Sequence, residues 1–300
     1  MSDFKPLGAQ SATRAHSRSL HGLTPSDGVL EASAWYQKPI PSRKWCVDGV
    51  IPRHEVTQIS GDGGGGKSII TLQLLVAATA GGDWLGHKVP NMRVLGVYCE
   101  DDEDELHRRT AGILHGEGLD FSDCDGLTLT CRKGRESILF EANYNDMEGS
   151  TTAFYDRLRH TAMELGAEII ILDSLYNFFA GNENNRGHAN QFVNALCQMA
   201  QAIGGAVVLV SHPSLSGMAS GSGTAGNTAW HNAVRSRLYL HREKTNNPDD
   251  IGELVLEDMK QNYGPKNGKM KLRYDSGRFI NVTQEDFDTT PFSERTGGMS

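Results

Sequence analysis

Hydrophobic positions along the chain change period several times, from unbroken apolar runs to apolar residues spaced three or four apart. The runs at 168–173 (EIIILD) and 206–211 (AVVLVS) are almost wholly apolar, which is typical of strands buried on both faces. Between them, residues 188–203 carry apolar side chains on one helical stripe and end before a pair of glycines. Strands therefore alternate with helices, which predicts a parallel sheet flanked by helices.

The same periods predict further strands and helices. The strands are expected at 55–60, 93–99 and 126–131, and the helices at 67–80, about 103–117 and 151–165. Beyond residue 212 the alternation stops, and three strand-like segments follow without helices between them: 237–241 (RLYLH), 252–260 (GELVLEDMK) and 269–275 (KMKLRYD). The predicted fold class is therefore α/β, a mainly parallel twisted sheet flanked by helices, with an antiparallel patch at its C-terminal end.

Composition excludes some classes of protein and leaves others open. Apolar residues make up 38% of the 300 residues and charged residues 22%, which is ordinary for a globular protein. No run approaches the roughly 18 apolar residues that span a membrane, and the N-terminus has no apolar signal core, so we expect a cytoplasmic protein without membrane contact. The net charge of −8 argues against a generally basic surface that coats nucleic acid, but it leaves room for a local basic channel.

Four consecutive glycines precede the helix predicted at 67–80. Gly61 to Ser68 match the pattern G-x-x-x-x-G-K-[ST] between a strand and a helix, the context that a phosphate-binding loop requires. Glycines let several backbone N–H groups point at one phosphate chain, and the helix N-terminus adds a favourable dipole. Lys67 would reach the β- and γ-phosphates and Ser68 would ligate Mg²⁺. We expect a nucleoside triphosphate here, since a merely flexible turn would not need both flanking elements.

Acidic residues and a histidine stand at the ends of three other predicted strands. Asp173 ends a buried strand, where a carboxylate can hold Mg²⁺. Glu100 is the first acid after its strand and could orient an attacking water; Asp101 is the second choice, and the whole acidic run could instead be a solvated helix start. His212 could contact the γ-phosphate or be an ordinary loop residue. Because the carboxyl ends of parallel strands meet at one edge, we expect these side chains to converge there.

The order of these motifs resembles that of the RecA-like P-loop ATPases. It runs from the phosphate loop through CED, IIILDS and VSHPS to a Gly/Ser-rich loop, NAVRSRLYL and MKQNYGP. Within that group the chain resembles most the RepA-type hexameric replicative helicases of plasmids and phages, over about residues 45–275. The resemblance implies a RecA-like ATPase domain, six subunits in a ring, ATP with Mg²⁺ bound between neighbours, and single-stranded DNA in a central channel.

We place the ATPase domain at residues 41–280. Residues 1–40 are polar and lack a sustained period, so we expect an extended or disordered N-terminal arm. The arm either packs on a neighbouring subunit or stays unstructured. Residues 281–300 are expected to form a flexible C-terminal tail.

The resemblance also assigns roles near the bound nucleotide. Arg109, nine residues after Glu100, would stack on adenine, and Tyr263 would cover the other face of the base. His212 matches the residue that senses the γ-phosphate. The expected nucleotide-binding residues are Gly61, Gly63, Gly64, Gly65, Gly66, Lys67, Ser68, Ile69, Arg109, Lys260 and Tyr263, and the expected metal ligands are Ser68 and Asp173.

A second set of roles would be filled by a neighbouring subunit. Arg235 matches the arginine finger and Arg237 is its close rival, although both could serve only in salt bridges. Lys260 matches a lysine that ring helicases place two residues before a second arginine, a position occupied here by Asn262. The expected catalytic residues are Glu100, Lys67, Asp173, His212, Arg235 and Arg237.

DNA contact is expected from two long polar loops, one containing Arg186 and the other spanning 214–229. The second loop has no Lys or Arg, so binding per subunit should be weak, and the loops could instead serve only the active site. The leading function is an ATP-driven helicase or translocase on single-stranded DNA in plasmid or phage replication. The alternatives are a RecA-like recombinase or recombination mediator that forms filaments on DNA, and a regulatory ATPase that is not a motor.

Overall fold

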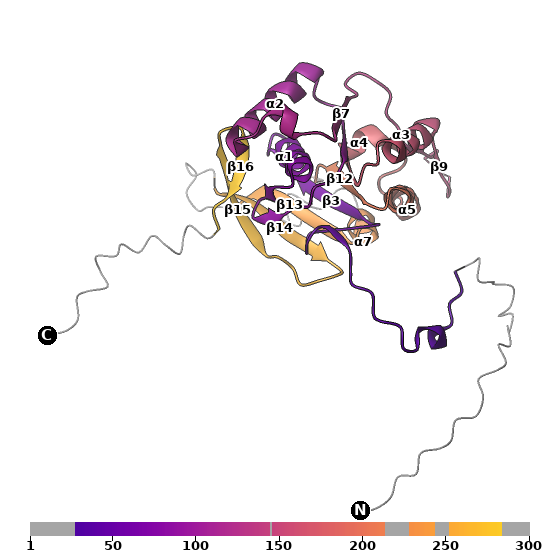
Figure 1. Ribbon diagram of the computed structural model, residues 1–300. Coiled ribbons are helices and arrows are strands. Elements are labelled where there is room, and N and C mark those ends of the chain that lie inside the picture. The colour runs from indigo at the N-terminus through magenta and orange to yellow at the C-terminus, as the bar shows by residue number, and fades with distance from the viewer. Residues whose placement is uncertain (1–27, 145, 214–227, 244–251, 284–300) are drawn as a thin grey trace, which may run out of the picture. The chain divides into compact units, whose positions relative to one another are not determined.

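The computed structural model describes residues 28–144, 146–213, 228–243 and 252–283 (Figure 1). The chain divides into two compact units, Met1–Ser42 and Arg43–Ser300. The described part of the first unit contains a 3₁₀ helix, η2 (Ala32–Trp35), none of whose residues is buried. All other elements belong to the second unit.

The second unit is built on one large sheet, which has nine strands among the described residues. Their order is β16-β15-β14-β13-β3-β12-β10-β6-β7. In chain order, these strands are β3 (Val56–Gly61), β6 (Val94–Tyr98), β7 (Leu127–Cys131), β10 (Ile169–Asp173), β12 (Ala206–Ser211), β13 (Ser236–Arg242), β14 (Leu254–Gln261), β15 (Lys269–Asp275) and β16 (Arg278–Asn281). The strands from β13 to β7 are mutually parallel, whereas β14, β15 and β16 are added antiparallel. The predicted fold class, with its antiparallel C-terminal patch, is confirmed.

Short strands form three small additional sheets. They are β1 (Trp45–Val47) with β2 (Ile51–Pro52), β4 (Asp83–Trp84) with β5 (His87–Lys88), and the group β11 (Phe179–Ala180), β8 (Phe140–Glu141) and β9 (Ser150–Thr151). In the last group, β11 follows the carboxyl end of β10, whereas β8 and β9 precede β10 in the chain.

Helices cover both faces of the large sheet (Figure 1). They are α1 (Lys67–Ala80), α2 (Glu103–Glu117), η3 (Phe121–Asp123), α3 (Ala153–Glu164), α4 (Leu175–Phe178), α5 (Arg186–Ala202) and α7 (Thr228–Ala233). Side-chain caps fix where the longer ones begin: Asp102 accepts from the amide of Glu105, and Thr152 accepts from that of Tyr155. Helix α1 instead begins and ends at left-handed glycines, Gly66 and Gly81.

Alternate residues of the central strands pack into two separate hydrophobic cores, one on each face of the sheet. Ile169 and Ile171 of β10 join the core that contains α1 and α2, whereas Ile170 and Leu172 join the core that contains α3, α4, α5 and α7. This explains the unbroken apolar runs of the sequence, because both faces of the central strands are covered. The arrangement brings the ends of β3, β6, β10 and β12 to one edge, the carboxyl edge of the sheet.

Candidate functional site

The glycine-rich loop after β3 curls around the side chain of Lys67, which is only 5% exposed. Its Nζ donates hydrogen bonds of 2.7 Å to the carbonyl oxygens of Gly61 and Asp62. A Cβ at Gly61 would lie 2.6 Å from the carbonyl oxygen of Leu240, so no larger residue fits there. Gly66 has a φ of 97°, a left-handed conformation that favours glycine. The loop therefore has the curled form that a phosphate chain requires.

A cavity of about 190 Å³ opens beside this loop. Its lining combines the loop with the ends of the neighbouring strands and one residue of α2: Gly64, Gly65, Gly66, Lys67, Ser68, Ile69, Glu100, Asp101, Arg109, Asp173 and His212. The residues predicted at the carboxyl edge thus converge as expected. Burial lowers the pKa of Lys67, and the nearby carboxylates, Asp173 first, oppose that shift. Lys67 and Arg109 are the lysine and arginine side chains in this lining.

Asp173 is suited to bind a cation at the end of β10. It is 5% exposed and accepts a hydrogen bond from the side chain of Ser68, while its Oδ2 atom is buried without a hydrogen-bond partner. Burial raises the pKa of Asp173 to about 6. An unsatisfied buried carboxylate oxygen beside a serine hydroxyl fits the donor set that Mg²⁺ prefers. In the part of the chain that the structure describes, no group of three or more His, Cys, Asp or Glu forms a separate metal site.

Glu100 and His212 face each other across the mouth of the cavity. Oε1 of Glu100 lies 3.9 Å from Nε2 of His212, whose other ring nitrogen is 3.4 Å from Nζ of Lys67. Burial and the charge of Lys67 lower the pKa of His212, so the ring is neutral near pH 7. The Glu100 side chain is 60% exposed and can therefore reach a water molecule. Both residues line the cavity beside the glycine-rich loop.

Asp101, the second choice for orienting water, is engaged elsewhere. Its Oδ2 lies 2.6 Å from Nη1 of Arg109, and Nε of the same arginine bonds to Oε1 of Glu105 at 2.8 Å. Burial raises the pKa of Asp101 and Arg109 opposes the shift. This pairing favours Glu100 over Asp101 as the water-orienting acid. It also holds Arg109 in the cavity wall, where the guanidinium could contact a base.

The site residues expected from the late part of the chain lie at the opposite, amino edge of the sheet. They are Arg235, Arg237, Lys260 and Tyr263. Ser236 pairs with Thr57 at the start of β3 and with Gln261 at the end of β14, which places this end of the patch far from the phosphate loop. The Tyr263 hydroxyl donates to Oε1 of Glu55 at 2.5 Å, and Arg43 lies 4.0 Å over its ring. Within one subunit, Tyr263 therefore cannot cover a base held by Arg109, because the two lie at opposite edges.

The two candidate arginine fingers differ in exposure. Arg235 is exposed at the amino edge, whereas Arg237 is 1% exposed and its Nη1 lies 2.9 Å from Nδ1 of His231. Burial lowers the pKa of Arg237 to about 10. Lys260 donates hydrogen bonds to the carbonyl oxygens of His231 and Asn232, at 2.9 and 3.1 Å. In this conformation the guanidinium of Arg237 is buried within its own subunit, whereas that of Arg235 is accessible from outside.

Two residues that contact the candidate site, Ser174 and Phe279, were not among those expected from the sequence. Ser174 donates a hydrogen bond to Glu100, and Asn177 donates a longer one to Ser174. The sequence did offer one indication of Ser174, because it directly follows Asp173 at the end of a predicted strand. Phe279 of β16 packs on the phosphate loop at Gly66, and nothing in the sequence indicated this contact between segments so distant. The peptide bond between Asp173 and Ser174 is cis.

The residues expected to contact DNA are only partly described. Arg186 is exposed at the first turn of α5, behind the Asn185 cap. Most of the second loop, residues 214–227, lies outside the described residues. Among the residues that are described, no helix combines the length and apolarity needed to cross a membrane.

Comparison with known proteins supports the fold. A solved structure, that of a KaiC-like protein from the hyperthermophilic archaeon Pyrococcus horikoshii OT3, superimposes with a TM-score of 0.55 and 12% sequence identity. The alignment covers 81% of this chain and 99% of that one, so the two share the fold. The family described as AAA domain matches residues 24–218, more than half of the chain, and the chain therefore belongs to this family of P-loop ATPases.

Proposed function

We propose that the protein is a ring-shaped ATPase that hydrolyses ATP to move along or unwind single-stranded DNA during plasmid or phage replication. The observation that carries the proposal is the division of cationic groups between two edges of the sheet. Lys67 lies at the carboxyl edge with the phosphate loop, whereas Arg235 and Lys260 lie at the amino edge. In a head-to-tail assembly, the amino edge of one copy would face the phosphate loop of the next.

The chain's own residues would divide the chemistry of hydrolysis among them. Backbone amides of the phosphate loop and Lys67 would bind the β- and γ-phosphates, with Ser68 and Asp173 holding Mg²⁺. When bound, Mg²⁺ would neutralise charge on the phosphate oxygens. Glu100, oriented by Ser174, would accept a hydrogen bond from the attacking water and place it in line. Arg235 of a neighbouring copy would stabilise the charge of the transition state.

The nucleotide site would be connected to DNA through the segment after β10. Ser174 contacts Glu100, and the Tyr176 ring of α4 lies 6.3 Å from the His212 ring in a stacked orientation. The same segment leads through β11 to Arg186 at the start of α5. A change at the γ-phosphate would thus move residues that lead directly to an exposed arginine, which supports a coupling between hydrolysis and a backbone phosphate of DNA.

Two other functions use the same ATPase site. A RecA-like recombinase or mediator would form open filaments on DNA, because a head-to-tail interface that does not close produces a helix. A regulatory ATPase would assemble with nucleotide but would not respond to DNA. Electron microscopy with an ATP analogue and single-stranded DNA separates closed rings, here expected to be hexamers, from filaments and monomers.

A strand-separation assay completes the test. With ATP and Mg²⁺, the protein should displace a labelled strand from a forked duplex, and Glu100→Gln should not. Rings that hydrolyse ATP at the same rate with and without single-stranded DNA would contradict the proposed motor and favour the regulatory ATPase.

A further inference from the structure

The aromatic ring of Phe279 seals one side of the phosphate loop. Phe279 is 6% exposed, and a Cβ built on Gly66 would lie 2.6 Å from both Cε2 and Cζ of its ring. Gly66 is the residue that must adopt the left-handed conformation immediately before Lys67. The Tyr274 ring packs edge-on against Phe279, with centroids 5.3 Å apart. The ring therefore fills the space into which the loop would relax if Gly66 changed its conformation.

The backbone of Phe279 is bound to the helix that follows the loop. Gln73 of α1 is 2% exposed; its Nε2 donates to the carbonyl oxygen of Phe279 at 2.9 Å, and its Oε1 accepts from the Phe279 amide at 3.0 Å. β16 is the edge strand of the large sheet, and the Gln73 side chain pairs with its backbone as a neighbouring strand would. Two buried hydrogen bonds fix the distance between β16 and α1, since leaving either peptide group unpaired would be costly.

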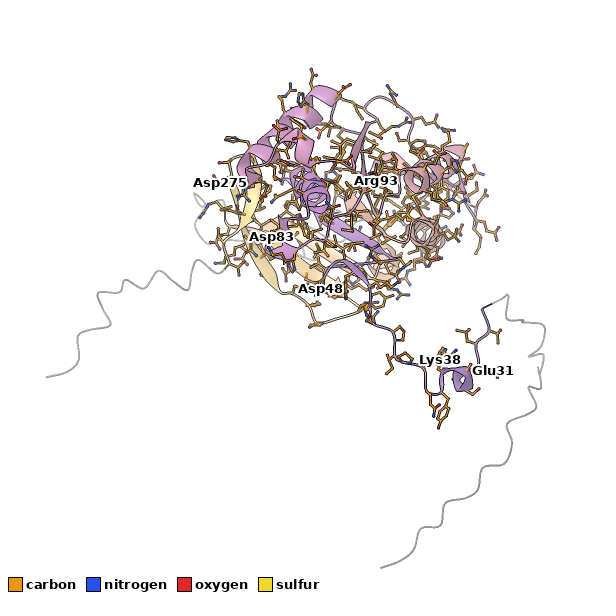
Figure 2. The ribbon with its side chains drawn as sticks, in the orientation of Figure 1. Glu31, Lys38, Asp48, Asp83, Arg93 and Asp275 are labelled. Atoms are coloured by element: carbon orange, nitrogen blue, oxygen red, sulfur yellow. The ribbon has the colours of Figure 1, made fainter. Side chains whose placement is uncertain are left out.

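The other end of the hairpin is fixed to α2, which carries Arg109. Nη1 of Arg278 lies 2.9 Å from Oε1 of Glu117. A Cβ on Gly277, in the turn that follows Asp275 (labelled in Figure 2), would lie 2.5 Å from the carbonyl carbon of Gly112. The turn thus packs directly on the backbone of α2, and the β15–β16 hairpin contacts both helices that flank the nucleotide cavity.

We infer that Phe279 and Gln73 are positioning residues for nucleotide binding, which hold Gly66 and the N-terminus of α1 in the form that accepts phosphate. Neither side chain lines the cavity, so both act through the loop. The inference rests on the assignment of the glycine-rich loop as the nucleotide site. It adds that the affinity of this site depends on Phe279, a residue of the hairpin that lies 206 residues beyond Gln73 along the chain.

The test compares two variants at the hairpin with a variant in the core on the other face of the sheet. Phe279→Leu and Gln73→Met act at the hairpin, whereas Phe192→Leu shortens a fully buried phenylalanine of α5 in the other core. Each protein is titrated with a fluorescent ATP analogue and Mg²⁺, and its thermal midpoint is measured without nucleotide. We expect Phe279→Leu and Gln73→Met to weaken nucleotide binding about tenfold, the effect of ~1.4 kcal/mol, and Phe192→Leu to leave it unchanged.

The three possible failures are distinguishable. If Phe279→Leu and Gln73→Met lose thermal stability but bind nucleotide as tightly as the wild type, the hairpin serves only the core and the inference is overturned. If Phe192→Leu weakens binding equally, the effect reflects general destabilisation and the inference is also overturned. If the wild type binds no nucleotide, or Lys67→Ala binds it equally well, the phosphate-loop assignment fails and the inference fails with it.

Discussion

The hydroxyl of Ser174 donates a hydrogen bond of 3.0 Å to Oε1 of Glu100, joining the ends of β10 and β6 at the mouth of the nucleotide cavity. The first residue after one strand thereby orients the first acid after another. Because the Glu100 side chain is 60% exposed, this bond is an important restraint on its direction. Orientation matters for a group that must align a water molecule with a phosphorus atom.

Glu100→Gln should retain nucleotide binding and lose most hydrolysis, because the amide no longer accepts a proton from water. We expect kcat to fall about 10²- to 10⁴-fold. Ser174→Ala should lower kcat by a smaller factor and leave the nucleotide affinity unchanged, because the carboxylate remains but is less well oriented. Steady-state ATPase assays with direct nucleotide titration check both. Full activity of Glu100→Gln would move the role away from Glu100.

Lys67→Ala should remove hydrolysis altogether. The side chain is buried among loop carbonyls and is the cation that the cavity offers to the β- and γ-phosphates. Lys88→Ala, which removes an exposed lysine, provides the control. Phosphate release measured over a range of ATP concentrations distinguishes lost turnover from weakened binding. Normal turnover by Lys67→Ala would refute the phosphate-loop assignment.

The raised pKa of Asp173 should make the free energy of unfolding depend on pH in the absence of nucleotide and metal. Its pKa is raised from 3.8 to about 6, so between these values the folded protein binds more protons than the unfolded chain. Stability should therefore fall as the pH rises through this window and remain lower above it, by roughly 3 kcal/mol for a shift of this size.

Asp173→Asn should abolish that contribution. Relative to the wild type, the variant should be stabilised at pH 7, and the gain should disappear towards pH 4. Thermal midpoints across this range check the prediction, with Asp156→Asn on the exposed face of α3 as the control. Parallel pH profiles for the wild type and Asp173→Asn would show that burial of this carboxylate does not affect stability.

The central strands and the phosphate loop could be predicted from the sequence because their signals are local. Residues 206–211 form β12 and residues 67–80 form α1 as expected, since an unbroken apolar run and a glycine-flanked, largely apolar stretch each have one simple structural explanation. Two-residue strands such as β4 and β11 gave no periodic signal, because two residues do not define a period.

The parts of the site that sequence could not provide depend on contacts between distant segments. The burial of Arg237 follows from its packing beside His231, and the place of Tyr263 follows from the register of β13 with β14. The contact of Phe279 with Gly66 requires that the last strand return to the first loop. None of these relationships leaves a local pattern of residue types.

Arg235 and Arg237 should respond differently to removal of their side chains. Arg237→Ala should destabilise the fold by roughly 1–3 kcal/mol, because it empties a buried site beside His231. Arg235→Ala should leave stability within about 0.5 kcal/mol, since the residue is exposed, yet lower the ATPase rate. Calorimetry together with ATPase assays separates the two effects. Wild-type turnover by Arg235→Ala would exclude this residue as the finger.

A mixture of two inactive variants tests the shared nucleotide site most directly. Lys67→Ala lacks a working phosphate loop and Arg235→Ala lacks the proposed finger, so each alone should be nearly inactive; an arginine supplied in trans contributes about 10³- to 10⁵-fold. In mixed assemblies, some interfaces join an intact phosphate loop to an intact Arg235. The account predicts that ATPase activity partly returns on mixing and is lost on dilution. A mixture with no more activity than the sum of its parts would contradict it.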